Sequence, residues 1–242
     1  MTMKTRKYLT TIVAAVAGGM VAFAATDTLT VRIKAMRCED CAHKVSRVLN
    51  DREGVEGLDF NLERRTVTVE YDADKTCADS ICNALMATRR YVPTPYSKDE
   101  VIRRGIGLKL EEMRTEEDAE RVMKDLGTEV GIDSLAPHVD KRYVFVRYDA
   151  NRTTKAAVKE KLADMGFTPV SYYTSDIISH AYFRIPTEAA NEETIEKAIT
   201  LEGVDDANVN RKTGALAITY VNSRTTEQEL KKALKEEGVE VY

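Results

Sequence analysis

Hydrophobic residues alternate with polar ones in several stretches of the chain and recur at helical spacing in others. Val31 and Ile33 alternate with polar neighbours, which predicts a β-strand. Val45, Val48 and Leu49 then follow at the spacing of one helix face. The pattern therefore opens with a strand that leads into a helix.

The next stretch has the pattern of a hairpin followed by a second helix. Hydrophobic residues alternate over residues 58–62 and again over 67–71, with a turn at Glu63–Arg64 between them. Thr76 and Asp79 are predicted to cap the helix that comes next. Together these signals extend the order of elements to strand, helix, strand, strand, helix.

The chain carries an internal repeat. A shift of 77 residues aligns the sequence with itself from Val31 to Leu85 without a gap, which makes chance similarity a poor explanation. The matched pairs include Met36 with Met113, Val45 with Val122, Gly54 with Gly131, and Tyr71 with Tyr148. A third, weaker copy begins near Ser179. The sequence therefore predicts three copies of one unit.

Each copy is predicted to fold as a βαββαβ unit, with a last short strand that begins at Tyr91–Val92 in the first copy. This order is the split-βαβ, ferredoxin-like arrangement of an α+β protein. We expect three tandem units over residues 26–97, 104–175 and 177–242. Each should have a four-stranded antiparallel sheet with two helices on one face.

The N-terminal segment has the composition of a signal peptide. Three basic residues lie within the first seven, and an almost uncharged run follows over residues 8–24. Ala22 and Ala24 fit the small-residue positions before a signal-peptidase site, which predicts cleavage after Ala24 and an exported, periplasmic or secreted protein. An uncleaved membrane anchor is the alternative.

The charge balance excludes some classes of partner. The whole chain has a net charge of −4, and without residues 1–24 it has 33 basic and 40 acidic side chains, a net charge of −7. An acidic chain without a basic stripe is a poor nucleic-acid binder. No second apolar run is long enough to span a bilayer once the signal is removed.

The strongest chemical signal is the pair Cys38 and Cys41, placed between the first strand and the first helix. Two thiols at this spacing can close on one metal ion, and a helix N-terminus favours their thiolate form. Thiolates select the soft ions Cu(I), Hg(II), Zn(II) and Cd(II) over hard cations. With two protein ligands, Cu(I) or Hg(II) suits the pair better than tetrahedral Zn(II). Such an open site can also accept a thiol from a partner.

The motif Met36–Cys41, which follows a strand and opens a helix, resembles that of the heavy-metal-associated domain family. This family includes copper chaperones, the N-terminal modules of metal-pumping P-type ATPases and the periplasmic mercury-binding protein. The resemblance covers the first copy, and Arg90-Tyr91 stands where the family usually has Gly-Tyr. It implies that Cys38 and Cys41 are the metal ligands and that Met36 packs beneath their loop. It also implies a carrier, chaperone or buffer of a soft metal ion, Cu(I) above all, whose partner is a metal-transport or efflux protein.

Two further cysteines, Cys77 and Cys82, lie near the start of the predicted second helix. This helix begins at the opposite end of the sheet from the Cys38 and Cys41 loop, so we do not expect them to complete that site. Five residues of helix separate two Cα atoms by about 8–9 Å, which is too far for an unstrained disulfide. Cys82 is therefore interpreted as a half-buried side chain, with a disulfide as the alternative if the helix begins later.

Several polar residues are expected near the cysteine pair. Arg89, Arg90 and Tyr91 belong to a loop at the same end of the sheet, where a guanidinium could offset the negative charge of a bis-thiolate complex. The alternative is two solvated arginines at a helix C-terminus. His43 is expected to point to solvent, with a role as a supplementary ligand as the alternative.

The later copies lack the cysteine pair. Thr115 and Asp118 take its place in the second copy and predict a capping box, in which both side chains satisfy backbone donors. Glu188 and Asn191 stand near these positions in the third copy, and no cysteine follows Cys82. We interpret both copies as unable to bind a soft metal and as suited to docking or spacing.

Three other interpretations of the cysteine pair stay open. It could form a disulfide in an oxidising compartment, it could serve a thiol–disulfide redox protein, or it could be unused in an interaction scaffold. The chain has no Trp, which thioredoxin-like proteins typically carry before their motif. No nucleophile–base pair, phosphate loop or carboxylate dyad is found, so we do not expect an enzyme.

Overall fold

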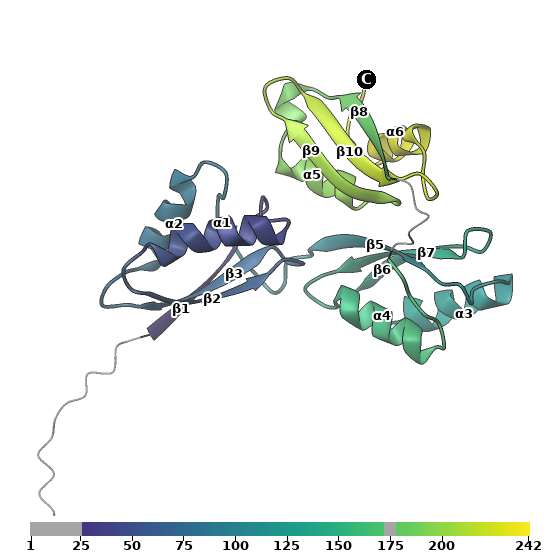
Figure 1. Cartoon of the computed structure of the whole chain (residues 1–242), viewed down its shortest axis with the longest axis horizontal. Helices are drawn as coiled ribbons and strands as arrows, with labels where there is room; N and C mark the ends of the chain where they lie inside the picture. The colour runs from purple at the N-terminus through teal and green to yellow at the C-terminus, as the bar shows by residue number, and fades with distance from the viewer. Residues whose placement is uncertain (1–25, 172–177) are drawn as a thin grey trace, which may run out of the picture.

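The computed structural model describes residues 26–171 and 178–242. Its elements form three units, each with its own antiparallel sheet and its own cluster of buried hydrophobic side chains (Figure 1). The predicted signal peptide lies outside the described residues. No helix in the described part of the chain has both the length and the apolar character that crossing a membrane requires.

The first unit contains the cysteine pair. Its elements are β1 (Thr26–Arg32), α1 (Glu39–Asn50), β2 (Val55–Asn61), β3 (Thr66–Asp72), α2 (Ala78–Ala87) and β4 (Thr94–Pro95). The strands pair antiparallel in the order β2-β3-β1-β4. This is the ferredoxin-like arrangement, so the predicted fold class is confirmed.

The second and third units repeat this order in sheets of three strands each. The second contains β5 (Arg103–Lys109), α3 (Glu116–Gly127), β6 (Ile132–His138), β7 (Tyr143–Asp149) and α4 (Lys155–Asp164). The third contains β8 (Ile178–Arg184), η1 (Thr187–Ala189), α5 (Glu192–Ile199), β9 (Val204–Asn210), β10 (Ala215–Val221) and α6 (Glu227–Glu236). Their strand orders, β5-β7-β6 and β8-β10-β9, match β1-β3-β2.

Among the described residues, the second and third sheets have three strands each, where four were predicted. In the second unit a single bridge between Lys109 and Val170 lies beside β5, where a fourth strand would run. The next donor on this side is the Thr168 N–H, which donates to the Glu112 carboxylate at 3.1 Å and so does not extend the pairing. In the third unit, Tyr242 donates one backbone hydrogen bond to Arg184 on β8.

The last strand of the first unit also begins later than predicted. The Tyr91 backbone N–H donates to the Thr88 hydroxyl at 2.9 Å, and this bond keeps Tyr91 in the turn that ends α2. Pairing with β1 starts only at Thr94, which lies opposite Arg32.

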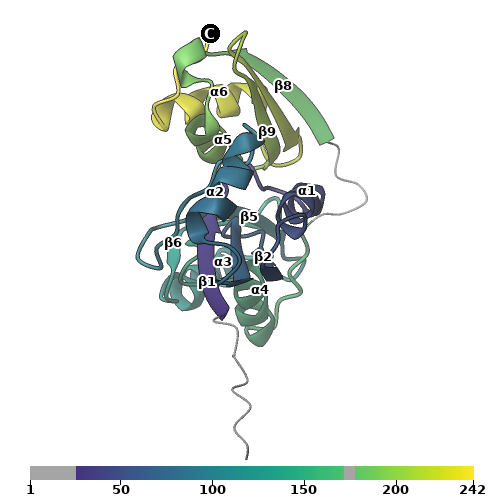
Figure 2. The same cartoon turned by 90° about the vertical axis from the view of Figure 1, so that its left-hand side faces the viewer.

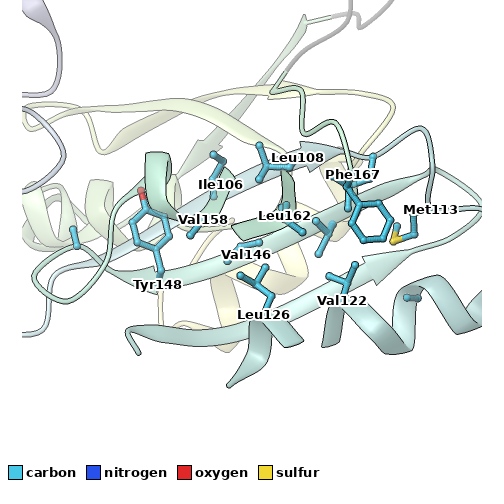
Figure 3. Close-up of a cluster of buried hydrophobic side chains, with 14 of the residues drawn as sticks. Ile106, Leu108, Met113, Val122, Leu126, Val146, Tyr148, Val158, Leu162 and Phe167 are labelled. Carbon is cyan, nitrogen blue, oxygen red and sulfur yellow. The ribbon is translucent and has the colours of Figure 1, made fainter. Parts of the chain in front are cut away.

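The core of each unit lies between the sheet and its two helices. In the second unit β5 and β7 contribute Ile106, Leu108 and Val146, and the helices contribute Val122 and Leu162. Figure 3 shows these side chains meeting between the strands and the helices. All five are buried. Alternate residues of a strand face the same side, as do residues three or four apart on a helix, so these side chains meet in one core.

A glycine turn of the same geometry follows the first helix of every unit. Gly54, Gly131 and Gly203 have positive φ angles of 86°, 90° and 76°. A Cβ at these positions would lie within 3.1 Å of a threonine methyl group that follows the third strand of the unit. The three threonines are Thr76, Thr153 and Thr225. Only glycine avoids both the backbone strain and the steric clash.

The second helix of the first unit begins differently from its counterparts. Thr154 caps α4 by accepting from the Ala157 N–H, and Thr226 forms a capping box with Glu229 at α6. The N-cap of α2 is Cys77, whose side chain makes no capping hydrogen bond. The predicted cap by Thr76 and Asp79 is therefore wrong, because the N-cap is Cys77, one residue after Thr76.

A threonine at this N-cap should stabilise the first unit. Cys77→Thr should raise the free energy of unfolding by about 1 kcal/mol, since a hydroxyl can accept from an N–H that now has no side-chain partner. The midpoint of urea unfolding and hydrogen exchange at the Ser80 amide would measure the effect, and Thr154→Cys in α4 is the reverse control. Unchanged exchange at Ser80 would contradict the proposed cap.

The third unit lies across the other two (Figures 1 and 2). Its Glu196 on α5 accepts from Arg32 of the first unit at 2.7 Å and lies 3.5 Å from Arg65. Both arginine side chains are at most 5% exposed. Since a buried guanidinium needs a charged partner, Glu196 of the third unit and Glu100, which accepts from Arg32 at 2.6 Å, together balance the buried arginines of the first unit.

Candidate metal centre

The cysteine pair lies in the loop between β1 and α1. The Met36 N–H donates to the Ile33 carbonyl at 2.8 Å, which turns the chain at the end of β1. The Met36 side chain is completely buried in the core of the first unit, beneath the loop. Cys38 is the N-cap of α1, with an extended backbone and no capping hydrogen bond from its side chain. The loop is therefore fixed from below, while the Cys38 thiol remains outside the helix.

The structure brings the two thiols together. The Sγ atoms of Cys38 and Cys41 lie 3.0 Å apart, and neither cysteine is in a disulfide. Cys41 is 6% exposed in the first turn of α1, whereas Cys38 is exposed. One sulfur therefore forms the floor of the site and the other faces solvent.

The two thiols differ in acidity. Burial acts to raise the pKa of Cys41, but hydrogen bonds from the Cys38 thiol and from the backbone, together with the positive charge of Arg90, lower that pKa overall. The pKa of Cys38 is raised, chiefly because its thiol donates to Cys41. Cys41 is therefore the first thiolate of the pair, and Cys38 holds the shared proton until an ion displaces it.

The loop after α2 lies beside the pair, as the topology predicted. The Arg90 guanidinium lies 5.5 Å from the centre of the Tyr91 ring, and its charge acts on Cys41. The Tyr91 side chain is buried, which raises the pKa of its hydroxyl. Arg90 and Tyr91 thus lie on the side of the site closest to the buried sulfur. The Arg90 guanidinium can offset the negative charge of a bis-thiolate complex there.

Cys38 and Cys41 are the two candidate metal ligands at this site. His43 is exposed on α1, as expected. Across residues 26–171 and 178–242, no group of three or more His, Cys, Asp or Glu side chains is arranged to hold a metal ion. A bound ion would therefore keep open coordination positions, which a thiol from another protein could fill.

Cys77 and Cys82 are remote from this site. The charge of Cys77 acts on Tyr71, whose hydroxyl donates to Asp27 at the start of β1, whereas Cys38 follows the end of that strand. Cys82 is half-buried, and this burial raises the pKa of its thiol. The structure thus separates the two cysteine pairs, in agreement with the prediction from topology.

The corresponding loops of the later units begin ordinary helices. Thr115 and Asp118 form the predicted capping box at the start of α3. In the third unit Asn191 is the N-cap of α5 and accepts from two backbone N–H groups, while Glu188 lies in η1. The side chains of Thr115, Asp118 and Asn191 thus hydrogen-bond the backbone at the places where the first unit has its thiols.

No local pattern in the sequence points to the role of Arg37. This residue, between Met36 and Cys38, donates to the Asp206 carboxylate at 3.2 Å and to the Ala207 carbonyl, both on β9 of the third unit. The metal loop is therefore attached to a unit that begins far along the chain. Such a contact has no local pattern, because it depends on how the units pack.

Comparison with known proteins places the match in the first unit. The model of the heavy-metal-associated domain matches residues 30–85. The copper chaperone CopZ of Staphylococcus saprophyticus is 33% identical over 58 residues, which are 24% of this chain and 85% of that protein. The periplasmic component of the mercuric transport protein of Pseudomonas aeruginosa is 32% identical over 62 residues, 26% of this chain and 68% of that protein.

Among solved structures, oxidized MerP from Ralstonia metallidurans CH34 is 29% identical, with 30% of this chain and all of that chain covered and a TM-score of 0.28. The relationship rests on the sequence matches and on the motif itself. With Cys38 and Cys41 in an open loop over a buried Met36, this chain belongs to the heavy-metal-associated domain family.

Proposed function

We propose that the protein is a non-enzymatic carrier or chaperone for one soft metal ion, with Cu(I) as its preferred cargo. The observation that carries the proposal is the approach of the Cys38 and Cys41 sulfurs to 3.0 Å at the start of a helix. Relatives named as a copper chaperone and as a mercuric transport component support a soft ion. The relatives include carriers of both ions, CopZ at 33% identity and a mercuric transport component at 34%, so the titration described below decides between copper and mercury.

The geometry fits an ion of low coordination number. Two sulfurs on opposite sides of an ion, each at about 2.3 Å, lie about 4.6 Å apart. The pair must therefore widen from 3.0 Å when an ion enters. Cys38 can supply this movement by rotating outward, since its side chain makes no capping bond and is exposed.

Transfer of the ion follows from the same asymmetry. A thiol on a metal-transport or efflux protein would meet Cys38 first, because Cys41 is buried. The incoming sulfur would fill an open position before Cys38 leaves the ion, so that the ion is never released into solvent. Arg90 would offset the negative charge of the intermediate.

We also propose that the chain is exported and that residues 1–24 are removed. The basic start, the uncharged run and the Ala22/Ala24 pair support this proposal, as does a periplasmic relative. The intact mass of protein isolated from its native cell envelope should correspond to a chain that starts at Ala25. A chain that retains residues 1–24 would instead indicate an uncleaved anchor.

Metal titration tests the carrier proposal. The reduced protein, purified without air, should bind one equivalent of Cu(I) or Hg(II) tightly and Zn(II) more weakly, because two sulfurs leave Zn(II) without its four donors. Competition with a chelator of known affinity would measure each constant. Three tight equivalents per chain would show that the later units bind metal, and tighter binding of Zn(II) than of Cu(I) would overturn the proposed cargo.

A further inference from the structure

The three units enclose a cavity of about 520 Å³ at their junction, which we call the junction cavity. The first unit contributes Arg37 and the turn between β2 and β3, and the second contributes the face of β5 and β7 that points away from its core. The third contributes the end of α5, the start of β9 and the turn after β10. This volume is typical of small-molecule sites.

Positive charge exceeds negative charge in the wall of the cavity. The cationic residues are Arg37, Arg65, Arg104, Lys155 and Arg224, and the acidic ones are Glu63, Asp205 and Asp206. Two of these carboxylates are already engaged within the protein. Glu63 accepts from the Tyr148 hydroxyl and from the Lys155 backbone N–H, and Asp206 accepts from Arg37.

Arg104 presents an unused donor to this region. Its Nε donates to the Glu63 carbonyl at 2.7 Å and its Nη1 donates to the Arg103 carbonyl at 2.9 Å. Its Nη2 is buried and has no hydrogen-bond partner among the residues that the structure describes. A buried guanidinium nitrogen without an acceptor is costly, so a ligand oxygen at this position would be stabilising.

The electrostatics of the neighbouring cations also favour a bound anion. Burial, followed by repulsion from Arg104, lowers the pKa of Arg65 to about 9. Burial also lowers the pKa of Arg104 and of Lys155. Each charged form is disfavoured in the present surroundings, and an anion in the cavity would favour it.

Two glycines lie against the aromatic side of the cavity. Gly105 and Gly107 on β5 lie next to the rings of Phe145 and Tyr143. A Cβ at Gly105 would lie 2.8 Å from the Phe145 ring, and one at Gly107 would lie 2.3 Å from the Tyr143 hydroxyl. Larger residues on this strand would therefore displace the aromatic rings that form the wall.

We propose that the junction cavity binds a small multivalent oxyanion, a phosphate or a di- or tricarboxylate, at a site separate from the metal centre. The ligand would accept from Arg104 Nη2 and lie among the cationic side chains of the wall. Because all three units contribute to the wall, the bound anion would hold them together. Arg37 lines the cavity and adjoins Cys38, so the anion would also steady the metal loop.

Calorimetry on the full mature chain with Cys38→Ser and Cys41→Ser tests this site without any metal. Inorganic phosphate, pyrophosphate and citrate are the probes, each at the same ionic strength and against chloride. At least one should bind with one equivalent per chain. Arg104→Gln should weaken that binding about tenfold or more, as expected for a lost charge-assisted hydrogen bond. The control is Arg103→Gln, whose side chain is 73% exposed and outside the cavity wall, and it should change the binding less than twofold.

The outcomes separate the proposal from its alternatives. No binding of any probe at concentrations up to about 10 mM would overturn it, and so would equal weakening by Arg103→Gln, which indicates attraction to surface charge alone. Circular dichroism would check the folding of each variant. If Arg104→Gln does not fold, the exposed Lys155→Gln replaces it with the same expected direction. Preference for citrate over pyrophosphate would identify a carboxylate ligand, and the reverse order a phosphate.

Discussion

Replacing Cys38 or Cys41 with serine should abolish tight binding of Cu(I) and Hg(II). Each cysteine supplies one of the two sulfurs that we propose as ligands, which lie 3.0 Å apart. A hydroxyl is a hard donor that soft ions avoid. The loss of affinity should exceed the roughly 10–100-fold that results when a residue behind a ligand is removed. Competition titration against a chelator, under reducing conditions, measures this loss.

The second cysteine pair supplies the matched control. Cys77→Ser combined with Cys82→Ser removes two sulfurs from the same unit, one more than either single variant, but from the opposite end of its sheet. This variant should retain one tight equivalent. If it lost the ion as completely as Cys38→Ser does, the assignment of the ligands to the α1 loop would be wrong.

Two cysteines placed in the second unit should create a second site. Thr115 and Asp118 occupy the start of α3 as Cys38 and Cys41 occupy the start of α1, above the buried Met113 and Met36 respectively. The double change Thr115→Cys and Asp118→Cys should therefore raise the stoichiometry from one Cu(I) to two. The single change Thr115→Cys should add no tight site, since one sulfur does not hold the ion.

The same double change should cost stability before metal is added. It removes both hydrogen bonds of the capping box, which should lower the free energy of unfolding by about 1–2 kcal/mol. Cu(I) should restore this loss, because an ion that binds only the folded protein adds its binding free energy. Urea unfolding with and without Cu(I) measures both effects. A folded double variant that binds a single Cu(I) would refute the correspondence between the two loops.

Local patterns were sufficient for most of the first unit. The alternation around Glu63–Arg64 predicted the β2–β3 hairpin, and the helical spacing of Val45 and Leu49 predicted α1. The capping box at Thr115 was also recognisable from sequence, because its two bonds join residues three apart. Signals of this kind depend on neighbours along the chain and need no knowledge of the packing.

The errors arose where one hydrogen bond decides between two local structures. The bond from the Tyr91 N–H to Thr88 delays β4, and the bond from the Thr168 N–H to the Glu112 carboxylate takes the donor that would extend the bridge between Lys109 and Val170. The contacts between units were missed for another reason. Arg37 and Asp206 are 169 residues apart, and nothing in either segment identifies the other as its partner.

The contact between the first unit and Glu196 can form only late in synthesis. Arg32 and Glu196 are 164 residues apart, and at about 5–20 residues per second a ribosome makes the second about 8–30 s after the first. A newly made first unit can pack its core and present its cysteine loop during this interval. Arg32 can meet Glu100 early, because only 68 residues separate them, whereas Arg65 meets Glu196 only when α5 has been made. The first unit thus matures in two stages, and its full set of ion pairs forms only when the third unit packs against it.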